Sequence, residues 1–288
     1  MEFVTVTCDR DIHQQTLQSM SMDKFIQDPC YHYIVVESSL KPIKEWRALL
    51  EPYYTKHTLI LIDGNSPDIR NICGKYINGY YRQQILKLYI AKIIKSDYYT
   101  ILDSKDLFIK HLSTSNWPIL EGNDKFLYFT DGEYPPGTQV YKEWCDLIEA
   151  TTDRSKPAWA WYLQTPFKCK TEICKNIVDS LDINKLFDGL EYPSEFILYR
   201  YFTDTEFNPI LHQDSLNDRF SVQFWENLDI TEFDDILCDR RTYLVSFHRF
   251  FIAKNKEKTN EIKLKLVSIG LDASLVERVF DHKYWIKF

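Results

Sequence analysis

Residues 78–110 read NGYYRQQILKLYIAKIIKSDYYTILDSKDLFIK, a helical pattern followed by a short apolar segment and a group of charges. In the first part Ile85, Leu88 and Tyr89 fall at spacings of three and four residues, with polar residues between them. This spacing predicts an amphipathic helix with one face in the core. Residues 98–102, YYTIL, are aromatic and β-branched and too few for a helix. They predict a strand that is buried on both faces.

The predicted strand runs directly into Asp103, Ser104, Lys105 and Asp106. In open α/β folds a buried strand carries such residues to the carboxyl edge of the sheet, where ligands bind. Charges at that edge are costly unless a metal ion, a diphosphate or a lysine pairs them. The alternative is a solvated turn, because Asp and Ser are ordinary turn residues. This segment alone leaves both interpretations open.

Composition indicates a packed globular protein with an acidic balance. The 288 residues are 44% hydrophobic and 27% charged, which suits one large α/β domain with an appended helical tail. The net charge of -7 argues against a dedicated nucleic-acid binder, which would normally carry a basic face. The negative net charge does not exclude a local basic pocket for an anionic ligand.

The seven cysteines are odd in number and scattered, and no C-x-x-C is present. This pattern argues against a disulfide framework or a zinc site and favours a reducing compartment. The chain opens without a signal-peptide pattern, and no apolar run approaches the ~20 residues that a membrane-spanning helix needs. We therefore expect a cytoplasmic protein and leave open a peripheral contact with a membrane surface.

The first third of the chain predicts alternating strands and helices. Residues 3–7, 34–36 and 58–62 are β-branched runs typical of strands. Helical patterns separate them, the second at 44–51. Strands with intervening helices predict parallel βαβ units, and residues 78–110 supply a fourth unit.

The remainder predicts a mixed second half. Expected strands lie at 126–130, 159–162, 220–225 and 242–247, expected helices at 140–148, 171–180, 194–202, 254–269 and 274–280, and an expected turn at 165–167. We divide the chain into one domain over residues 1–253, with a nucleotide-binding half of about 1–125 and an acceptor-binding half of about 126–253, and a helical extension over residues 254–288.

The turn after the first strand carries Asp9, Arg10 and Asp11 but no glycine. Without a G-x-G-x-x-G it is a poor candidate for a dinucleotide site. These side chains either contact a nucleoside or cap the following helix.

In order and spacing, these segments resemble the bacterial and viral glycosyltransferases of the GT-A fold. The similarity is to an uncharacterised capsule-type group in which a G-x-x-x-Q-Q-x-x-K-L helix precedes a strand ending in L-D-S or L-D-A. The matching segments, which lie between about residues 3 and 250, are 79–88, 101–106, 165–167, 194–199 and 246–249.

This resemblance implies transfer of a sugar from a nucleotide-sugar, such as a UDP- or GDP-sugar, to a glycan or lipid-linked acceptor in surface polysaccharide or glycoprotein glycan synthesis. It places Thr7, Asp9 and Arg10 near the base or ribose. A D-x-D element in such enzymes normally chelates Mn²⁺ or Mg²⁺, which stabilises the leaving diphosphate as a Lewis acid. The corresponding metal ligands here are Asp103, Asp106 and His248, although His248 is alternatively an ordinary histidine at a strand end.

The sequence departs from D-x-D at one position. In an extended chain residues i and i+2 share a face, and the i+2 partner of Asp103 is Lys105. Asp106 lies one step further. Lys105, beside Ser104, could supply part of the positive charge with which a metal ion stabilises the diphosphate. Whether the reaction depends on a metal ion is therefore open.

For an inverting reaction we expect Glu195 to be the general base, at the head of a helix in the second half. Asp131 is the reserve. Alternatively Glu195 only complements the helix dipole. Gln84 and Lys87 are expected to face the donor or to brace the Asp103 turn, unless they are merely solvated.

Two other functions stay open. One is phosphotransfer with Asp103 as nucleophile, as in haloacid-dehalogenase-like phosphatases, although that family would want an acid where Lys105 stands. The other is a non-catalytic nucleotide- or glycan-binding relative. The glycosyltransferase hypothesis requires Asp9, Asp103 and His248 to surround one pocket.

Overall fold

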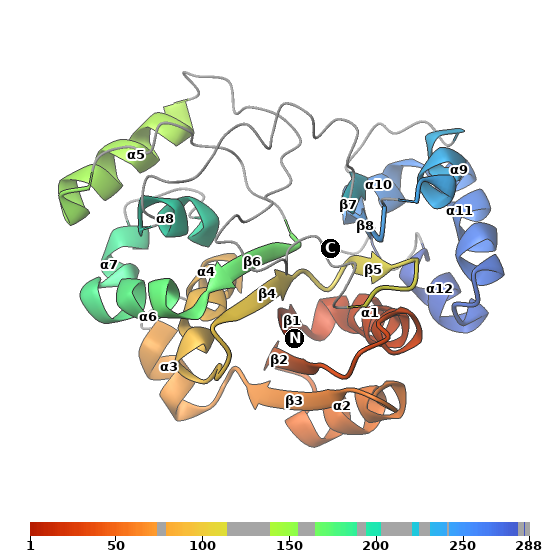
Figure 1. The fold of residues 1–288 in the computed structure, drawn as a ribbon, viewed down its shortest axis with the longest axis horizontal. Coiled ribbons are helices and arrows are strands. Elements are labelled where there is room, and N and C mark those ends of the chain that lie inside the picture. Colours follow the sequence, from red (N-terminus) through yellow and green to blue (C-terminus); the bar gives the residue numbers. More distant parts are fainter. Residues whose placement is uncertain are drawn as a thin grey trace.

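A central sheet of five strands in the order β3-β2-β1-β4-β6 organises the molecule (Figure 1). The computed structural model describes residues 1–73, 79–113, 139–154, 165–188, 194–202, 221–224, 231–240, 242–281 and 285. Four of the strands are parallel and the edge strand β6 is antiparallel to β4. The strands are β1 (Glu2–Cys8), β2 (Tyr31–Glu37), β3 (Thr58–Asp63), β4 (Tyr98–Leu102) and β6 (Phe167–Lys170).

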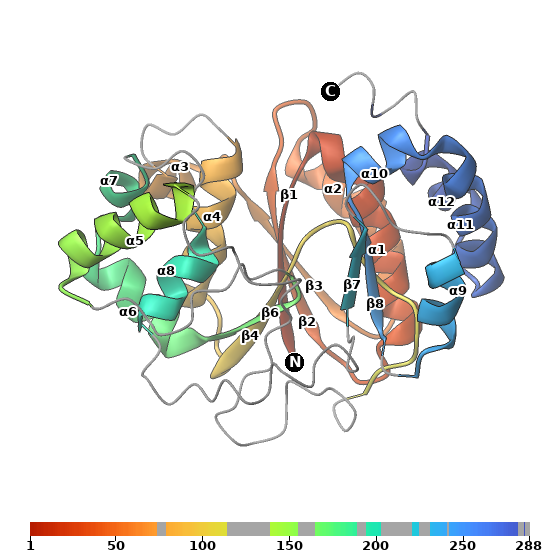
Figure 2. The ribbon, with the colours of Figure 1, turned by 90° about the horizontal axis from the view of Figure 1, so that it is seen from above.

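The two faces of this sheet pack against different sets of helices because side chains alternate along a strand (Figure 2). Val4 and Val6 of β1 belong to a core cluster with one set. That set is α3 (Pro67–Cys73), α4 (Gly79–Tyr89), α5 (Gln139–Thr152), α6 (Thr171–Ser180), α7 (Ile183–Asp188) and α8 (Glu195–Phe202). Phe3 points the other way and packs with α1 (Ile12–Phe25), and Ile34 and Val36 pack with α2 (Ile43–Leu50).

A second, three-stranded sheet lies beyond α1. Its strands β5 (Asp106–Phe108), β8 (Leu244–Phe247) and β7 (Ser221–Phe224) follow in that order, with β5 antiparallel and β7 parallel to β8. The flanking helices are α9 (Thr231–Cys238), α10 (Arg249–Lys254), α11 (Lys256–Ser268) and α12 (Ala273–Val279). Because β5 follows β4 after only a short turn, the second sheet brings the end of β8 to the end of β4.

Most predicted elements that fall on described residues are present, including all four parallel strands. One prediction was wrong. Phe167 was expected in a turn but begins β6, where Phe167 and Cys169 are buried against the core. Of the two interpretations left open for the charges after β4, the solvated turn does not hold for Asp106, which begins β5 and is fully buried. The predicted strands at 126–130 and 159–162 lie outside the described residues.

The C-terminal helices share a core with the rest of the molecule. Leu266 of α11 and Val276 of α12 belong to the same buried cluster as Phe3 of β1. Gly270 ends α11 with a φ of 90°, a left-handed conformation that glycine adopts without strain. The proposed boundary at residue 253 stays a prediction. Among the helices that the structure describes, none has the length and apolar character required to cross a bilayer.

Candidate active site

One cavity of about 1030 Å³ opens where the parallel strands end. Asp9 follows β1, Asp103 follows β4 and His248 follows β8, and all three line this cavity. The ends of parallel strands meet at one edge of a sheet, which explains why Asp9 and Asp103 converge here, and the pairing of β5 with β8 brings His248 to the same place. The volume is of the size that small-molecule sites occupy.

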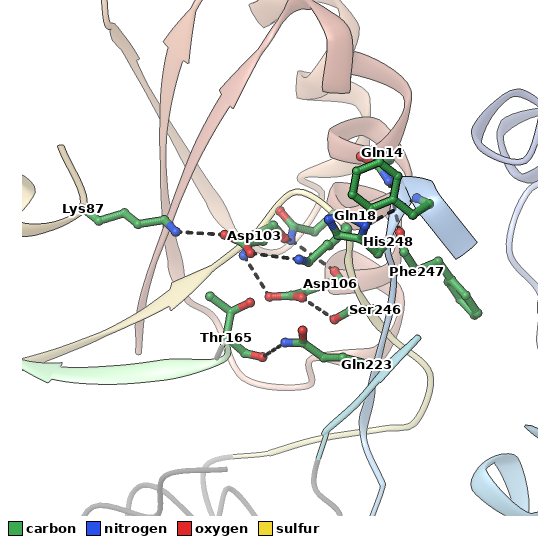
Figure 3. Close-up of polar contacts among 12 residues, drawn as sticks. Gln14, Gln18, Lys87, Asp103, Asp106, Thr165, Gln223, Ser246, Phe247 and His248 are labelled. Carbon is green, nitrogen blue, oxygen red and sulfur yellow. Dashed lines mark hydrogen bonds and ion pairs between the residues drawn. The ribbon is translucent and has the colours of Figure 1, made fainter. Parts of the chain in front are cut away.

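Asp103 lies between two ammonium groups (Figure 3). Its Oδ1 is 3.0 Å from the Nζ of Lys87, and its Oδ2 is 3.4 Å from the Nζ of Lys105. Burial opposes ionisation of the carboxyl, but the two lysines outweigh it and hold the pKa of Asp103 well below its ordinary value. Asp103 is therefore a carboxylate whose charge is already shared by two cations.

Lys87 also connects this turn to the second half of the chain. Its Nζ lies 3.1 Å from Oε1 of Glu195, and it sits 5.4 Å from the centre of the Phe196 ring. The side chains of Lys87 and Glu195 are 5% and 1% exposed. Burial lowers the pKa of Lys87, but the two carboxylates outweigh it and the net shift is upward, while burial raises the pKa of Glu195. With its amide nitrogen turned toward Glu195, Gln84 donates a further hydrogen bond to that carboxylate.

The turn that presents Asp103 is held by buried hydrogen bonds. The N–H of Asp106 donates to the carbonyl of Asp103 at 2.9 Å, and the N–H of Asp103 donates to Oδ2 of Asp106 at 2.8 Å. The hydroxyl of Ser246 donates to the other oxygen of Asp106. From α1, Gln18 donates to the carbonyls of both acids. Burial, together with the charge of Asp103, raises the pKa of Asp106 to about 6.

The partners of Asp9 among the described residues are neutral. Its carboxylate accepts hydrogen bonds from the Ser38 hydroxyl and from the N–H groups of Ser39 and Leu40, the last two at 2.8 and 2.9 Å. Burial opposes ionisation of Asp9, but these donors outweigh it and lower its pKa. Asp9 thus orders the loop that follows β2, and this loop also lines the cavity.

Of the other residues predicted to bind the donor, some line the cavity and one does not. Arg10 and Ser104 line the cavity, and Arg10 lies 3.7 Å from Asp11. Thr7 is fully buried in β1 and is not among the described residues that line the cavity. Asp131, the reserve base, lies outside the described residues.

His248 caps the start of α10, where its Nδ1 accepts from the N–H of Phe250 at 3.4 Å. Burial, together with the charges of Lys105 and Arg249, lowers the pKa of His248 to about 3, while the charge of Asp103 acts in the opposite direction. His248 is consequently a neutral imidazole near pH 7.

The residues predicted to hold Mn²⁺ or Mg²⁺ do not fit that task as they stand. Asp103 is bound to two lysines, and Asp106 directs both oxygens to the main chain and Ser246. Within the described parts of the chain, no three His, Cys, Asp or Glu side chains are grouped to hold a metal ion. A divalent ion would also meet the positive charge of Lys105 at close range.

Sequence reasoning missed several residues of this site. Ser246 and Arg249 belong to a segment already quoted for its resemblance, but only His248 was assigned a role. Gln18 could have been found from its helix, because Gln14 and Gln18 lie four residues apart on a face that must pack against a sheet. Both are buried, and Gln14 donates to the Phe247 carbonyl at 3.4 Å (Figure 3).

Comparisons with known proteins agree with this architecture. The model of a family described as a family of unknown function, DUF6492, matches residues 5–208. No curated protein matches the chain. The crystal structure of the galactosyltransferase LgtC in complex with donor and acceptor sugar analogs is similar with a TM-score of 0.53 at 13% identity, covering 93% of this chain and 95% of LgtC. The apo structure of the bifunctional glycosyltransferase WbbM has a TM-score of 0.51 at 13% identity, covering 85% of this chain and 45% of WbbM. The predicted GT-A fold is thereby confirmed, whereas the capsule-type group stays a prediction.

Proposed function

This chain belongs to DUF6492, a family of unknown function, and we propose that it is a glycosyltransferase that uses a nucleotide-sugar donor. The acceptor class that we propose is a glycan or a lipid-linked glycan of surface polysaccharide or glycoprotein synthesis. One observation carries the proposal: Asp9, Asp103 and His248 line a single cavity at the strand ends of a GT-A fold. In LgtC, a protein of similar fold, donor and acceptor sugar analogs were bound.

The donor's nucleoside would lie toward the ends of β1 and β2. Arg10 lines the cavity there, and Asp9 holds the loop of residues 38–40 in place through three hydrogen bonds. The diphosphate would lie toward Asp103 and Lys105 at the end of β4. In this arrangement the anionic leaving group meets cations at the point where its negative charge develops, which is where preorganised charge accelerates a reaction most.

Glu195 is the proposed general base for the acceptor hydroxyl. It lines the cavity and is almost fully buried, and burial raises its pKa toward the range in which a carboxylate accepts protons efficiently. Its contact with Lys87 offers a second role, in which Glu195 keeps Lys87 directed at Asp103. The Glu195→Gln variant separates the two roles. Loss of a base lowers transfer by roughly 10²–10⁴-fold and removes the acidic limb of the pH profile, whereas a positioning role mainly weakens donor binding.

The decisive experiment screens UDP-, GDP-, CMP- and dTDP-sugars by thermal shift and then measures donor hydrolysis and transfer with the sugar that binds. We expect one nucleotide class to stabilise the protein and Asp103→Asn to lower turnover at least about 100-fold, as loss of a preorganised electrostatic contact does. Asp179→Asn is the matched control, because Asp179 is an exposed acid that pairs with Lys92. Normal turnover by Asp103→Asn would contradict the proposal.

The same screen tests the two alternatives. A phosphotransfer enzyme with Asp103 as nucleophile would respond to phosphate esters without a preference for a nucleotide. A non-catalytic relative would bind a nucleotide-sugar and form no product with any acceptor.

A further inference from the structure

We infer that Lys105 and Arg249, rather than a divalent metal ion, hold the donor's diphosphate in this protein. The inference rests on the proposed function and specifies how that site recognises its ligand. Both side chains line the cavity, one from the turn after β4 and the other from the start of α10.

The first argument concerns the acids that a metal ion would need. Asp103 is engaged on both oxygens by ammonium groups, 3.0 Å from Lys87 and 3.4 Å from Lys105. Asp106 is fully buried, where it accepts from the N–H of Asp103 and from Ser246. A divalent ion would have to displace a lysine from Asp103 and break the turn that Asp106 holds together.

The second argument concerns charge balance. The ammonium groups of Lys87 and Lys105 are matched by the carboxylates with which they form ion pairs, Asp103 and Glu195. Arg249 adds a further positive charge, and no carboxylate of the described residues lies within ion-pair distance of it. Its guanidinium contacts the ring of its neighbour Phe250, 5.0 Å away. The floor of the cavity is therefore suited to an anion.

The third argument is geometric. Lys105 follows β4 of the five-stranded sheet, Arg249 follows β8 of the three-stranded sheet, and both line the same cavity. The two cations therefore reach the cavity from the ends of different sheets. A lysine acts on phosphate as a point charge, and an arginine can bind it with two parallel N–H groups. In the inferred arrangement each cation would bind one phosphate of the diphosphate.

The test is isothermal titration of the purified full chain with UDP, GDP and inorganic pyrophosphate, each in EDTA and in MnCl₂. We expect a nucleoside diphosphate to bind equally well in both buffers. Lys105→Met and Arg249→Met should each weaken its Kd about tenfold to a hundredfold, the usual effect of a lost charged hydrogen bond. Lys105→Arg should restore most of the binding, because it keeps the charge. Lys92→Met, at a surface lysine paired with Asp179, is the control and should bind normally.

Two results would overturn the inference and leave the proposed function standing: binding that disappears in EDTA and returns with Mn²⁺, or unchanged binding by folded Lys105→Met and Arg249→Met. Failure of UDP and GDP to bind the unaltered protein in either buffer, together with no stabilisation by any nucleotide-sugar in the thermal-shift screen, would overturn the proposed function and this inference with it. Melting curves of each variant establish that it is folded before its affinity is compared.

Discussion

Asp9 and Asp103 occupy equivalent places in the fold, because each follows a parallel strand of the same sheet and each lines the same cavity. Their surroundings differ in charge. Asp9 is met by a hydroxyl and two backbone N–H groups, whereas Asp103 is met by two ammonium groups. Burial opposes ionisation of both acids, and their partners outweigh it and lower both pKa values.

This difference teaches that an acid at a strand end has no fixed task. Neutral donors allow Asp9 to order a loop, and the single oxygen of an asparagine could still accept from the N–H groups of Ser39 and Leu40. Ammonium partners make Asp103 part of an ionic network that also includes Glu195. In such a network removal of one charge leaves the others buried without compensation, which is far more costly than loss of a neutral hydrogen bond.

The largest effect should come from the cation at the centre of that network. Lys87→Met leaves Glu195 buried beside the Asp103 carboxylate with no opposite charge in contact. We expect the free energy of unfolding to fall by about 3–5 kcal/mol, the cost of breaking a buried ion pair. Urea denaturation measures the change. The control is Lys92→Met at an exposed pair, for which little change is expected because water screens such pairs.

Asp106 is a third acid for this comparison. It accepts from neutral donors, like Asp9, but it is fully buried. Its folded pKa of about 6 lies above the ordinary value of 3.8, so the folded protein binds this proton more tightly than the unfolded chain does. The stabilisation is fully present below pH 3.8 and is lost as the pH rises through 6. From pH 4 to pH 7.5 the stability advantage of the unaltered protein over Asp106→Asn should shrink by about 2 kcal/mol, at 1.36 kcal/mol per pKa unit and with part of the effect already lost at pH 4.

Chemical denaturation at a series of pH values measures this change. Asp179→Asn serves as the reference, because Asp179 is exposed and its difference from the unaltered protein should stay nearly constant over the same range. A constant difference for Asp106→Asn as well would contradict the raised pKa.

The helix α1 supplies the neutral half of the site, and its contribution can be tested through Gln18. Gln18→Leu removes the donor to the carbonyls of Asp103 and Asp106. It also removes one acceptor each from the Thr5 hydroxyl and the Gln15 amide, which keep His32 and Ser19 as partners. A loss of about 2–3 kcal/mol is expected from these lost buried hydrogen bonds. Gln14→Leu breaks one long hydrogen bond on the same helix and should lose about 1 kcal/mol at most. Equal losses in the two variants would show that Gln18 has no special part in holding the turn.

The sequence predicts those elements whose own residues carry a pattern typical of a strand or a helix. Strands β1 to β4 each carry a β-branched or aromatic run, and such runs indicate a strand whatever surrounds them. Strand β5 has only three residues and begins with an acid. It exists because β8 pairs with it, and the Ser246 to Asp106 hydrogen bond joins residues 140 positions apart. No local pattern reports a partner so distant.

The same limit applies to the site. The positions of Asp9, Asp103 and His248 follow from strand ends and could be predicted. What each acid binds could not. The donors to Asp9 come from the loop after a neighbouring strand, 30 residues later in the chain at Ser39. Glu195 reaches Lys87 only because α8 and α4 pack on the same face of the sheet. Position at a strand end alone therefore does not distinguish an acid that orders a loop, such as Asp9, from an acid in an ionic network, such as Asp103.

The smallest effect should come from replacing Asp9, and it sharpens the comparison most directly. Asp9→Asn keeps one acceptor oxygen for the N–H groups of Ser39 and Leu40, removes the charge, and replaces the oxygen that accepts from Ser38 by an amide NH₂. We expect the free energy of unfolding to fall by less than about 1 kcal/mol, since each neutral hydrogen bond contributes about that much. Hydrogen exchange at the amides of Ser39 and Leu40 should quicken by about tenfold at most, which corresponds to roughly 1.4 kcal/mol. Asp103→Asn, the same chemical change at the other strand end, should cost clearly more because Lys105 then loses its carboxylate partner. Equal costs at the two positions would mean that the charge of the partners does not distinguish them.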